Sequence, residues 1–123
     1  MKRFVLLFAL LLPLPACGSS SKDRVELHGR ASVEVEAREH RFMPAWIVVD
    51  PGTTVTWKNE DPVAHHIHRA HGTPLIGGRF GVHTIGFRPG DSYSFTFAKS
   101  GKYFYMCSLH PGMNGIVEVA SAQ

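Results

Sequence analysis

The 123-residue sequence has little cysteine, no strong excess of charge and, after its first sixteen residues, no long apolar run. Two cysteines, Cys17 and Cys107, exclude a disulfide-rich scaffold. A formal charge of +3 with no cluster of basic residues offers no support for a nucleic-acid partner. A chain of this length forms one domain that can bury a workable core, and it is too short for a large multidomain enzyme.

The first sixteen residues have the pattern of a secretory signal. Two basic residues precede an apolar run from Phe4 to Leu12, which is too short to cross a bilayer as a helix. The following Leu14-Pro15-Ala16-Cys17 resembles the lipobox of bacterial lipoproteins, in which the cysteine becomes the lipidated first residue. We therefore expect a membrane-tethered, periplasmic or otherwise extracytoplasmic protein. The alternative is ordinary cleavage, which would leave Cys17 free and the protein secreted to the periplasm.

Residues 17–30 are expected to form a flexible tether, because they are Ser-rich and then charged, without a sustained apolar period. The alternative is a partly ordered first strand, since Val25 and Leu27 alternate with charged residues. The folded domain is expected over residues 31–120, followed by a short tail at 121–123.

Alternation of apolar and polar residues predicts strands through this domain. It occurs in residues 31–37, 53–58, 92–97, 102–107 and 116–119, and a short apolar run covers 46–49. Turn sequences such as Asp50-Pro51-Gly52 separate these segments, and residues 70–86 are expected to be a glycine-rich connection. No segment of ten residues shows a helical period, so the pattern predicts an all-β antiparallel sandwich or barrel.

A thiolate, an imidazole and a thioether lie within seven residues, at Cys107, His110 and Met113. Sulfur and imidazole together suit copper, and a Cys with two His and a weak axial Met is the ligand set of a blue-copper site. Alternation places Cys107 on the same face as Tyr103 and Tyr105, so its thiol is expected to point inward.

This ligand set needs a second imidazole from a residue before Cys107, and residues 59–68 contain three histidines. Ile67 is the natural core residue of this segment, so alternation directs His65 inward and His66 and His68 outward. We therefore expect His65 to be the ligand. A strand register shifted by one residue would make His66 the ligand instead.

Two stretches together resemble a known family. Residues 55–61 leading to His65, followed by residues 101–115, look like the small blue-copper proteins, the cupredoxins, and most of all plastocyanin and amicyanin. The two-residue gaps on either side of His110 are similar to the tight ligand loop of amicyanin-like members. The resemblance implies a Greek-key antiparallel β-sandwich that holds one copper ion through His65, Cys107, His110 and, weakly, Met113.

The same resemblance implies an electron carrier that passes single electrons between transient redox partners, acts as a monomer and does no bond chemistry. Asn59 and His66 are the candidates for positioning the ligands by hydrogen bonds. The electron is expected to leave through His110. The candidates for an apolar docking patch around this exit are Met43, Pro44, Pro111 and Gly112.

The same residues allow other functions to be compared with electron transfer. A copper chaperone or storage protein, with the metal as cargo, is the main alternative. A structural zinc site commonly uses four Cys or His in close pairs, and a dinuclear copper centre would need two cysteines in the loop, whereas only Cys107 is present. His66, His68 and His71 are an alternative surface group that collects copper; otherwise they and His83 are expected to be solvated.

Overall fold

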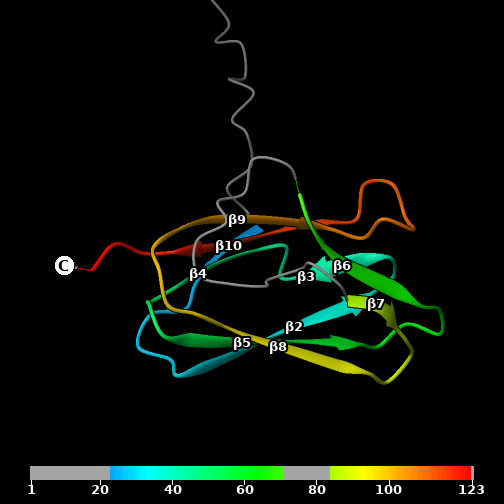
Figure 1. The fold of residues 1–123 in the computed structure, drawn as a ribbon, viewed down its shortest axis with the longest axis horizontal. Coiled ribbons are helices and arrows are strands. Elements are labelled where there is room, and N and C mark those ends of the chain that lie inside the picture. Colours follow the sequence, from blue (N-terminus) through cyan, green and yellow to red (C-terminus); the bar gives the residue numbers. More distant parts are fainter. Residues whose placement is uncertain (1–22, 71–83, 123) are drawn as a thin grey trace, which may run out of the picture.

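The computed structural model describes residues 23–70 and 84–122, and these residues form two β-sheets that pack face to face (Figure 1). The expected signal segment, Cys17, His71 and His83 lie outside the described residues. Among the residues that are described, no helix is long and apolar enough to cross a membrane.

The larger sheet has six strands in the order β1-β4-β10-β9-β6-β7. Their bounds are β1 Arg24–Glu26, β4 Trp46–Val49, β6 His65–Arg69, β7 Thr84–Phe87, β9 Gly101–Met106 and β10 Asn114–Val119. The smaller sheet has the order β3-β2-β5-β8, with β2 Ser32–Arg38, β3 Arg41–Met43, β5 Thr53–Asn59 and β8 Ser92–Phe97. The predicted all-β sandwich is confirmed.

The sheets are mixed rather than purely antiparallel. Strand β4 runs parallel to both β1 and β10, and β2 runs parallel to β5. The other pairings are antiparallel. Parallel neighbours arise because the chain crosses from one sheet to the other between them, as the order of the strands shows.

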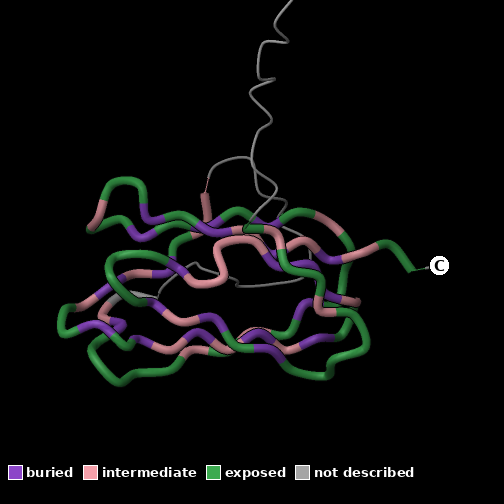
Figure 2. Tube along the Cα trace, turned by 180° about the vertical axis from the view of Figure 1, so that it is seen from behind, coloured by how far each residue is buried: buried purple, intermediate pink, exposed green. Residues whose placement is uncertain are grey.

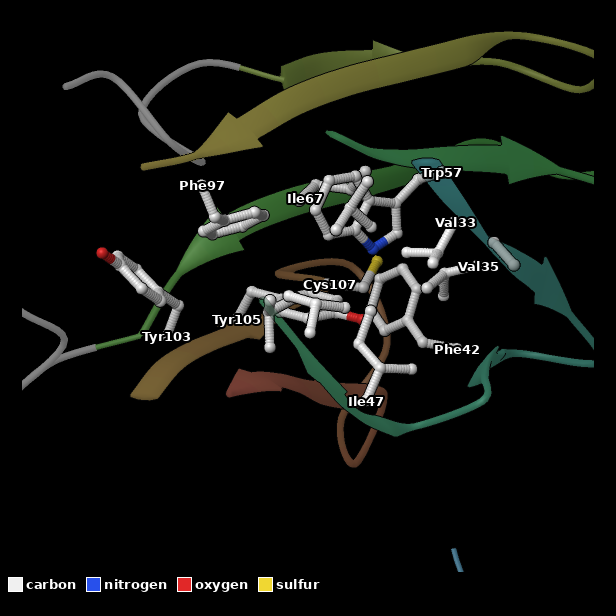
Figure 3. Close-up of a cluster of buried hydrophobic side chains, with 14 of the residues drawn as sticks. Val33, Val35, Phe42, Ile47, Trp57, Ile67, Phe97, Tyr103, Tyr105 and Cys107 are labelled. Atoms are coloured by element: carbon white, nitrogen blue, oxygen red, sulfur yellow. The ribbon is translucent and has the colours of Figure 1, made fainter. Parts of the chain in front are cut away.

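Alternate residues of the strands form the core between the sheets (Figure 2). Val55 and Trp57 of β5 are fully buried, and Tyr103 and Tyr105 of β9 are buried, as their alternation predicted. Figure 3 shows Cys107 among these buried side chains, between the two sheets. Burial of large apolar side chains at about 1.5–3 kcal/mol each is the main stabilising contribution to such a core.

A glycine lets the last strand approach this core closely. Gly115 of β10 lies directly opposite Tyr105 of β9, and a Cβ atom at Gly115 would be only 2.2 Å from Cζ of the tyrosine. Only a residue without a side chain fits beneath this ring. The contact fixes β10 against the strand that leads to Cys107.

Two segments differ from the sequence predictions. Residues 24–26, expected within a tether spanning 17–30, form β1, and the Leu27 N–H extends the pairing to the Val48 carbonyl at 2.8 Å. This is the partly ordered strand that the alternation of Val25 and Leu27 allowed. Residues 84–86, expected within a glycine-rich connection, belong to β7, which pairs with β6 at the edge of the larger sheet.

The sheet register brings the ends of three strands to one end of the sandwich. His68 of β6 lies opposite Met106 of β9, so the start of β6 is adjacent to the residues that follow β9. His65 is the first residue of β6, and Cys107 directly follows β9. The loop from 107 to 113 closes over this end before β10 begins.

Candidate metal centre

His65 is a fully buried imidazole at the first position of β6. Its neighbours His66 and His68 lie on the opposite face of the strand, where His66 is half-buried and His68 is exposed. The alternation inferred from Ile67 is therefore observed. A buried imidazole needs polar partners on its ring nitrogens, and both nitrogens of His65 have them.

Cys107 supplies a buried thiol that the backbone holds from two sides. The His66 N–H donates to its Sγ at 3.3 Å, and the Cys107 N–H donates to the Met113 carbonyl at 2.9 Å. The first contact joins β6 to the thiol, and the second closes the loop that carries His110. The two hydrogen bonds therefore hold the sulfur and the loop in one position relative to β6.

Three donor atoms converge between these elements. Cys107 Sγ lies 3.4 Å from His110 Nδ1 and 3.8 Å from His65 Nδ1, and the two nitrogens are 3.1 Å apart. A point equidistant from the three atoms lies about 2.0 Å from each, close to the usual length of a bond from a first-row metal to imidazole or thiolate. The donors therefore fit a single metal ion. Within residues 23–70 and 84–122 this is the one cluster of its kind.

The loop that follows Cys107 returns Met113 to the same end of the core. The Met113 N–H donates to the His110 carbonyl at 3.2 Å, and Gly112 adopts the left-handed conformation, with φ +85°, that the turn requires. Met113 is 1% exposed and belongs to the core cluster that also contains Cys107. Its thioether therefore faces the core and is shielded from solvent.

Asp61 fixes the ring of His65 from behind. Its Oδ2 lies 2.7 Å from His65 Nε2. Because an ionised carboxylate only accepts hydrogen bonds, Nε2 carries the proton and Nδ1 is left with a lone pair toward Cys107 and His110. This is the tautomer that a metal ligand requires.

The turn between β2 and β3 holds this carboxylate in place. The N–H groups of Glu39 and His40 donate to Asp61 at 2.6 and 3.0 Å, and both residues adopt positive φ angles of 52° and 57°. Burial raises the pKa of Asp61, but the hydrogen bonds from His40, His65 and Glu39 outweigh it and leave the pKa below its ordinary value. Asp61 is therefore ionised at neutral pH.

His40 adds a third imidazole at the mouth of the centre. Its ring packs edge-on against His110, with centroids 4.6 Å apart, and against His65 at 5.7 Å. Burial lowers the pKa of His110, and the nearby charges of His65 and His40 lower it further. His110 therefore stays neutral, with a lone pair available for a metal, to a lower pH than an isolated imidazole.

The other residues singled out in the sequence occupy distinct places. Asn59 is buried and its amide donates to the carbonyls of Val63 and Phe87, both at 2.9 Å, so it shapes the turn that leads to His65. Met43, Pro44 and Gly112 line one cleft of about 420 Å³ beside the centre. Pro111 is exposed in the loop next to it.

Sequence reasoning missed Asp61 and His40. Asp61 had a local signal, because a carboxylate four residues before a buried histidine can turn back onto it. His40 had none, because it reaches the centre only through the pairing of β2 with β3. His28, away from the centre, is exposed and lies between the carboxylates of Asp50 and Glu26.

The fold and the cluster together define a class: a small β-sandwich protein with one buried centre made of two imidazoles and a thiolate. A family model described as copper binding proteins of the plastocyanin/azurin family matches residues 29–120. The chain belongs to this family. Its cofactor is one copper ion, and the donor set and spacing described above fit that ion.

Individual proteins agree with this assignment. The chain is 29% identical over 104 residues to amicyanin-alpha of Methylorubrum extorquens, covering 85% of each protein. A solved amicyanin variant in its reduced state is similar, with a TM-score of 0.63 and 29% identity over 72% of this chain and 82% of that chain. A copper-containing nitrite reductase from Thermus scotoductus reaches a TM-score of 0.71 over 86% of this chain but only 30% of its own; at 24% identity it shows the fold alone.

Proposed function

We propose that this protein is a type 1 (blue) copper protein that carries single electrons between redox partners outside the cytoplasm. The ligands would be His65, Cys107 and His110, with Met113 as a weak axial ligand. The observation that carries the proposal is the triangle of Nδ1, Nδ1 and Sγ atoms, with sides of 3.1–3.8 Å around one point.

Bound copper supplies a one-electron couple, Cu(I)/Cu(II). The protein would keep the donors in one arrangement for both oxidation states, because each is held by bonds that do not depend on the metal. Asp61 orients His65, the His66 N–H holds the Cys107 sulfur, and the loop hydrogen bonds hold His110. Donors that are already in place need little rearrangement when the electron arrives or leaves.

The electron would leave through His110, whose ring is half-buried at the loop surface. Leu109 beside it is 48% exposed, and the cleft lined by Met43, Pro44 and Gly112 adjoins the same loop. A small apolar surface of this kind suits the weak, short-lived contacts that redox partners make. We propose that the partners are transient and that the protein is a monomer.

We propose an electron carrier rather than an enzyme. Four protein ligands would leave copper no evident open position for a substrate. Among the described residues, a single group of three His, Cys, Asp or Glu side chains could hold a metal ion, whereas the related fold of the nitrite reductase is only part of a longer chain.

The location is proposed from the N-terminal sequence. Removal of residues 1–16 and lipidation of Cys17 would tether the domain to a membrane in the periplasm or another extracytoplasmic space. Strand β1 begins at Arg24, so a short segment would separate a lipid on Cys17 from the folded copper domain.

A spectrum of the protein loaded with Cu(II) tests the function. We expect an intense thiolate-to-copper band near the red end of the visible range that a mild reductant bleaches reversibly. Cys107→Ser should abolish the band while circular dichroism shows a folded domain, and the matched control Cys17→Ser should keep it. A pale complex that is reduced slowly would instead favour a copper chaperone or storage protein.

A further inference from the structure

The outer face of β6 and β9 carries polar and sulfur side chains that the buried centre does not use. His66 and His68 point away from the core on β6, and Met106 does so on β9. Met106 lies directly opposite His68 in the antiparallel pair. The same register places Ser108 opposite His66, and the His66 Nδ1 is 2.7 Å from the Ser108 hydroxyl.

The strand register sets the spacing of these three side chains. Residues opposite each other on antiparallel strands have Cβ atoms about 4.5–5.5 Å apart, which sets the spacing of His68 and Met106. His66 and His68 are two residues apart on one strand, about 6.6 Å along it. Two imidazoles at this spacing can turn their rings toward a common point, and the long, flexible thioether of Met106 can reach the same point.

The donor atoms are accessible. His68 is exposed and Met106 is 38% exposed. The bond to Ser108 occupies Nδ1 of His66 and orients its ring, so Nε2 of that ring is the nitrogen left for a metal. A hydrogen bond on one imidazole nitrogen is the usual support for a metal on the other.

We propose that His66, His68 and Met106 form a second copper site on the outer face of the larger sheet. Imidazole together with thioether selects a soft ion, so the site would take Cu(I) in preference to Zn²⁺. Its donors lie on the opposite face of β6 and β9 from those of the buried centre. The two sites can therefore be filled independently, although His66 and Met106 directly adjoin His65 and Cys107 in the chain.

The test uses the full chain with its buried centre already loaded with one equivalent of copper and kept reduced without oxygen. Further Cu(I) is titrated in competition with a chromophoric Cu(I) chelator. We expect one additional equivalent to bind, and we expect His68→Ala and Met106→Leu each to weaken that binding at least about tenfold, since even loss of an outer partner of a metal site costs that much. After reoxidation the blue band of the first ion should be unchanged in both variants.

Two controls locate the site and identify the ion. His28→Ala removes a histidine held between Asp50 and Glu26 away from this face, and it should leave the second equivalent intact. A titration with Zn²⁺ should show weaker binding that Met106→Leu does not change, because zinc does not favour a thioether.

Three results would overturn the proposal: no second Cu(I) equivalent, a second equivalent unaffected by His68→Ala, or affinity for Cu(I) that Met106→Leu leaves unchanged. These results are separable from failure of the electron-carrier function. That failure would show as a missing blue band at the first equivalent, whatever happens at the second.

Discussion

Asp61 and His65 form a buried carboxylate–imidazole pair, with Oδ2 and Nε2 2.7 Å apart. The pair connects the turn before β6 to the metal centre, because it determines which nitrogen of His65 faces Cys107 and His110. The carboxylate in turn accepts hydrogen bonds from the Glu39 and His40 N–H groups. The β2–β3 turn therefore acts on the copper ligand through one side chain.

Asp61→Asn should lower the affinity for copper about 10–100-fold, the usual cost of losing a partner that orients a ligand. The carboxylate receives three N–H groups, whereas an amide has one acceptor oxygen and would turn its NH₂ group toward a donor. Competition with a copper chelator measures the change. Glu60→Gln is the matched control, since it neutralises the exposed neighbouring carboxylate, and an equal loss in both variants would contradict the role of Asp61.

Much of the fold could be predicted because one face of each long strand is buried. In β5, Val55 and Trp57 are buried and alternate with half-buried residues, so period two is clear. Strands β1 and β7 lie at the edges of the larger sheet and have only three and four residues. Strands this short contain too few alternating residues to be recognised from the sequence. The parallel pairs could not be predicted. Alternation shows which face of a strand is buried, but it does not show whether the neighbouring strand runs parallel or antiparallel to it.

The part of the site that lies within short stretches of sequence could be predicted. The spacing from Cys107 to His110 and Met113 lies within one loop, and the inward direction of His65 follows from Ile67. The packing of His40 against His110 depends on two strands that are distant from the loop in sequence. Such contacts exist only after the sheets have formed, so no local pattern reports them.

Gly115→Ala should destabilise the folded domain by about 1–3 kcal/mol, the usual cost of overpacking a core. The added Cβ would meet Cζ of Tyr105 at 2.2 Å and the hydroxyl oxygen at 2.3 Å, so the ring or β10 has to move. Chemical denaturation of the metal-free protein measures the free energy of unfolding. Asn114→Ala, at the exposed neighbouring position, should change it by no more than about 0.5 kcal/mol. Equal values for the two variants would show that the ring moves without cost.

The His28 imidazole should stabilise the fold in a pH-dependent way. Its hydrogen bonds to Asp50 and then to Glu26 raise its pKa above the ordinary value. A raised folded-state pKa gives stability that is fully present below the unfolded value of about 6.5 and is lost as the pH rises through the folded value. His28→Ala should therefore lower Tm more at about pH 5.5 than at about pH 9. An equal loss of Tm at the two pH values would contradict a charge-dependent role of His28 beside Asp50 and Glu26.

Copper affinity should fall in acid. The side chains around His110 determine the pH below which it falls steeply. Copper binds thiolate and neutral imidazole, so protons compete with it and are released on loading. Burial, and then the charges of His65 and His40, lower the pKa of His110, so competition at this ring should set in below the ordinary imidazole value of about 6.5. Chelator competition across this range, with proton release followed in weakly buffered solution, measures the profile.

His40→Gln tests the cause of that profile, because it removes one of the charges that lower the pKa of His110 while keeping the backbone N–H that binds Asp61. The steep part of the affinity curve should then move to higher pH. Asp61 stays ionised throughout, because its pKa is lowered, so its contribution does not change over this range. A curve that His40→Gln leaves in place would mean that burial and the charge of His65, and not His40, lower the pKa of His110, and an affinity independent of pH would contradict thiolate and imidazole ligation itself.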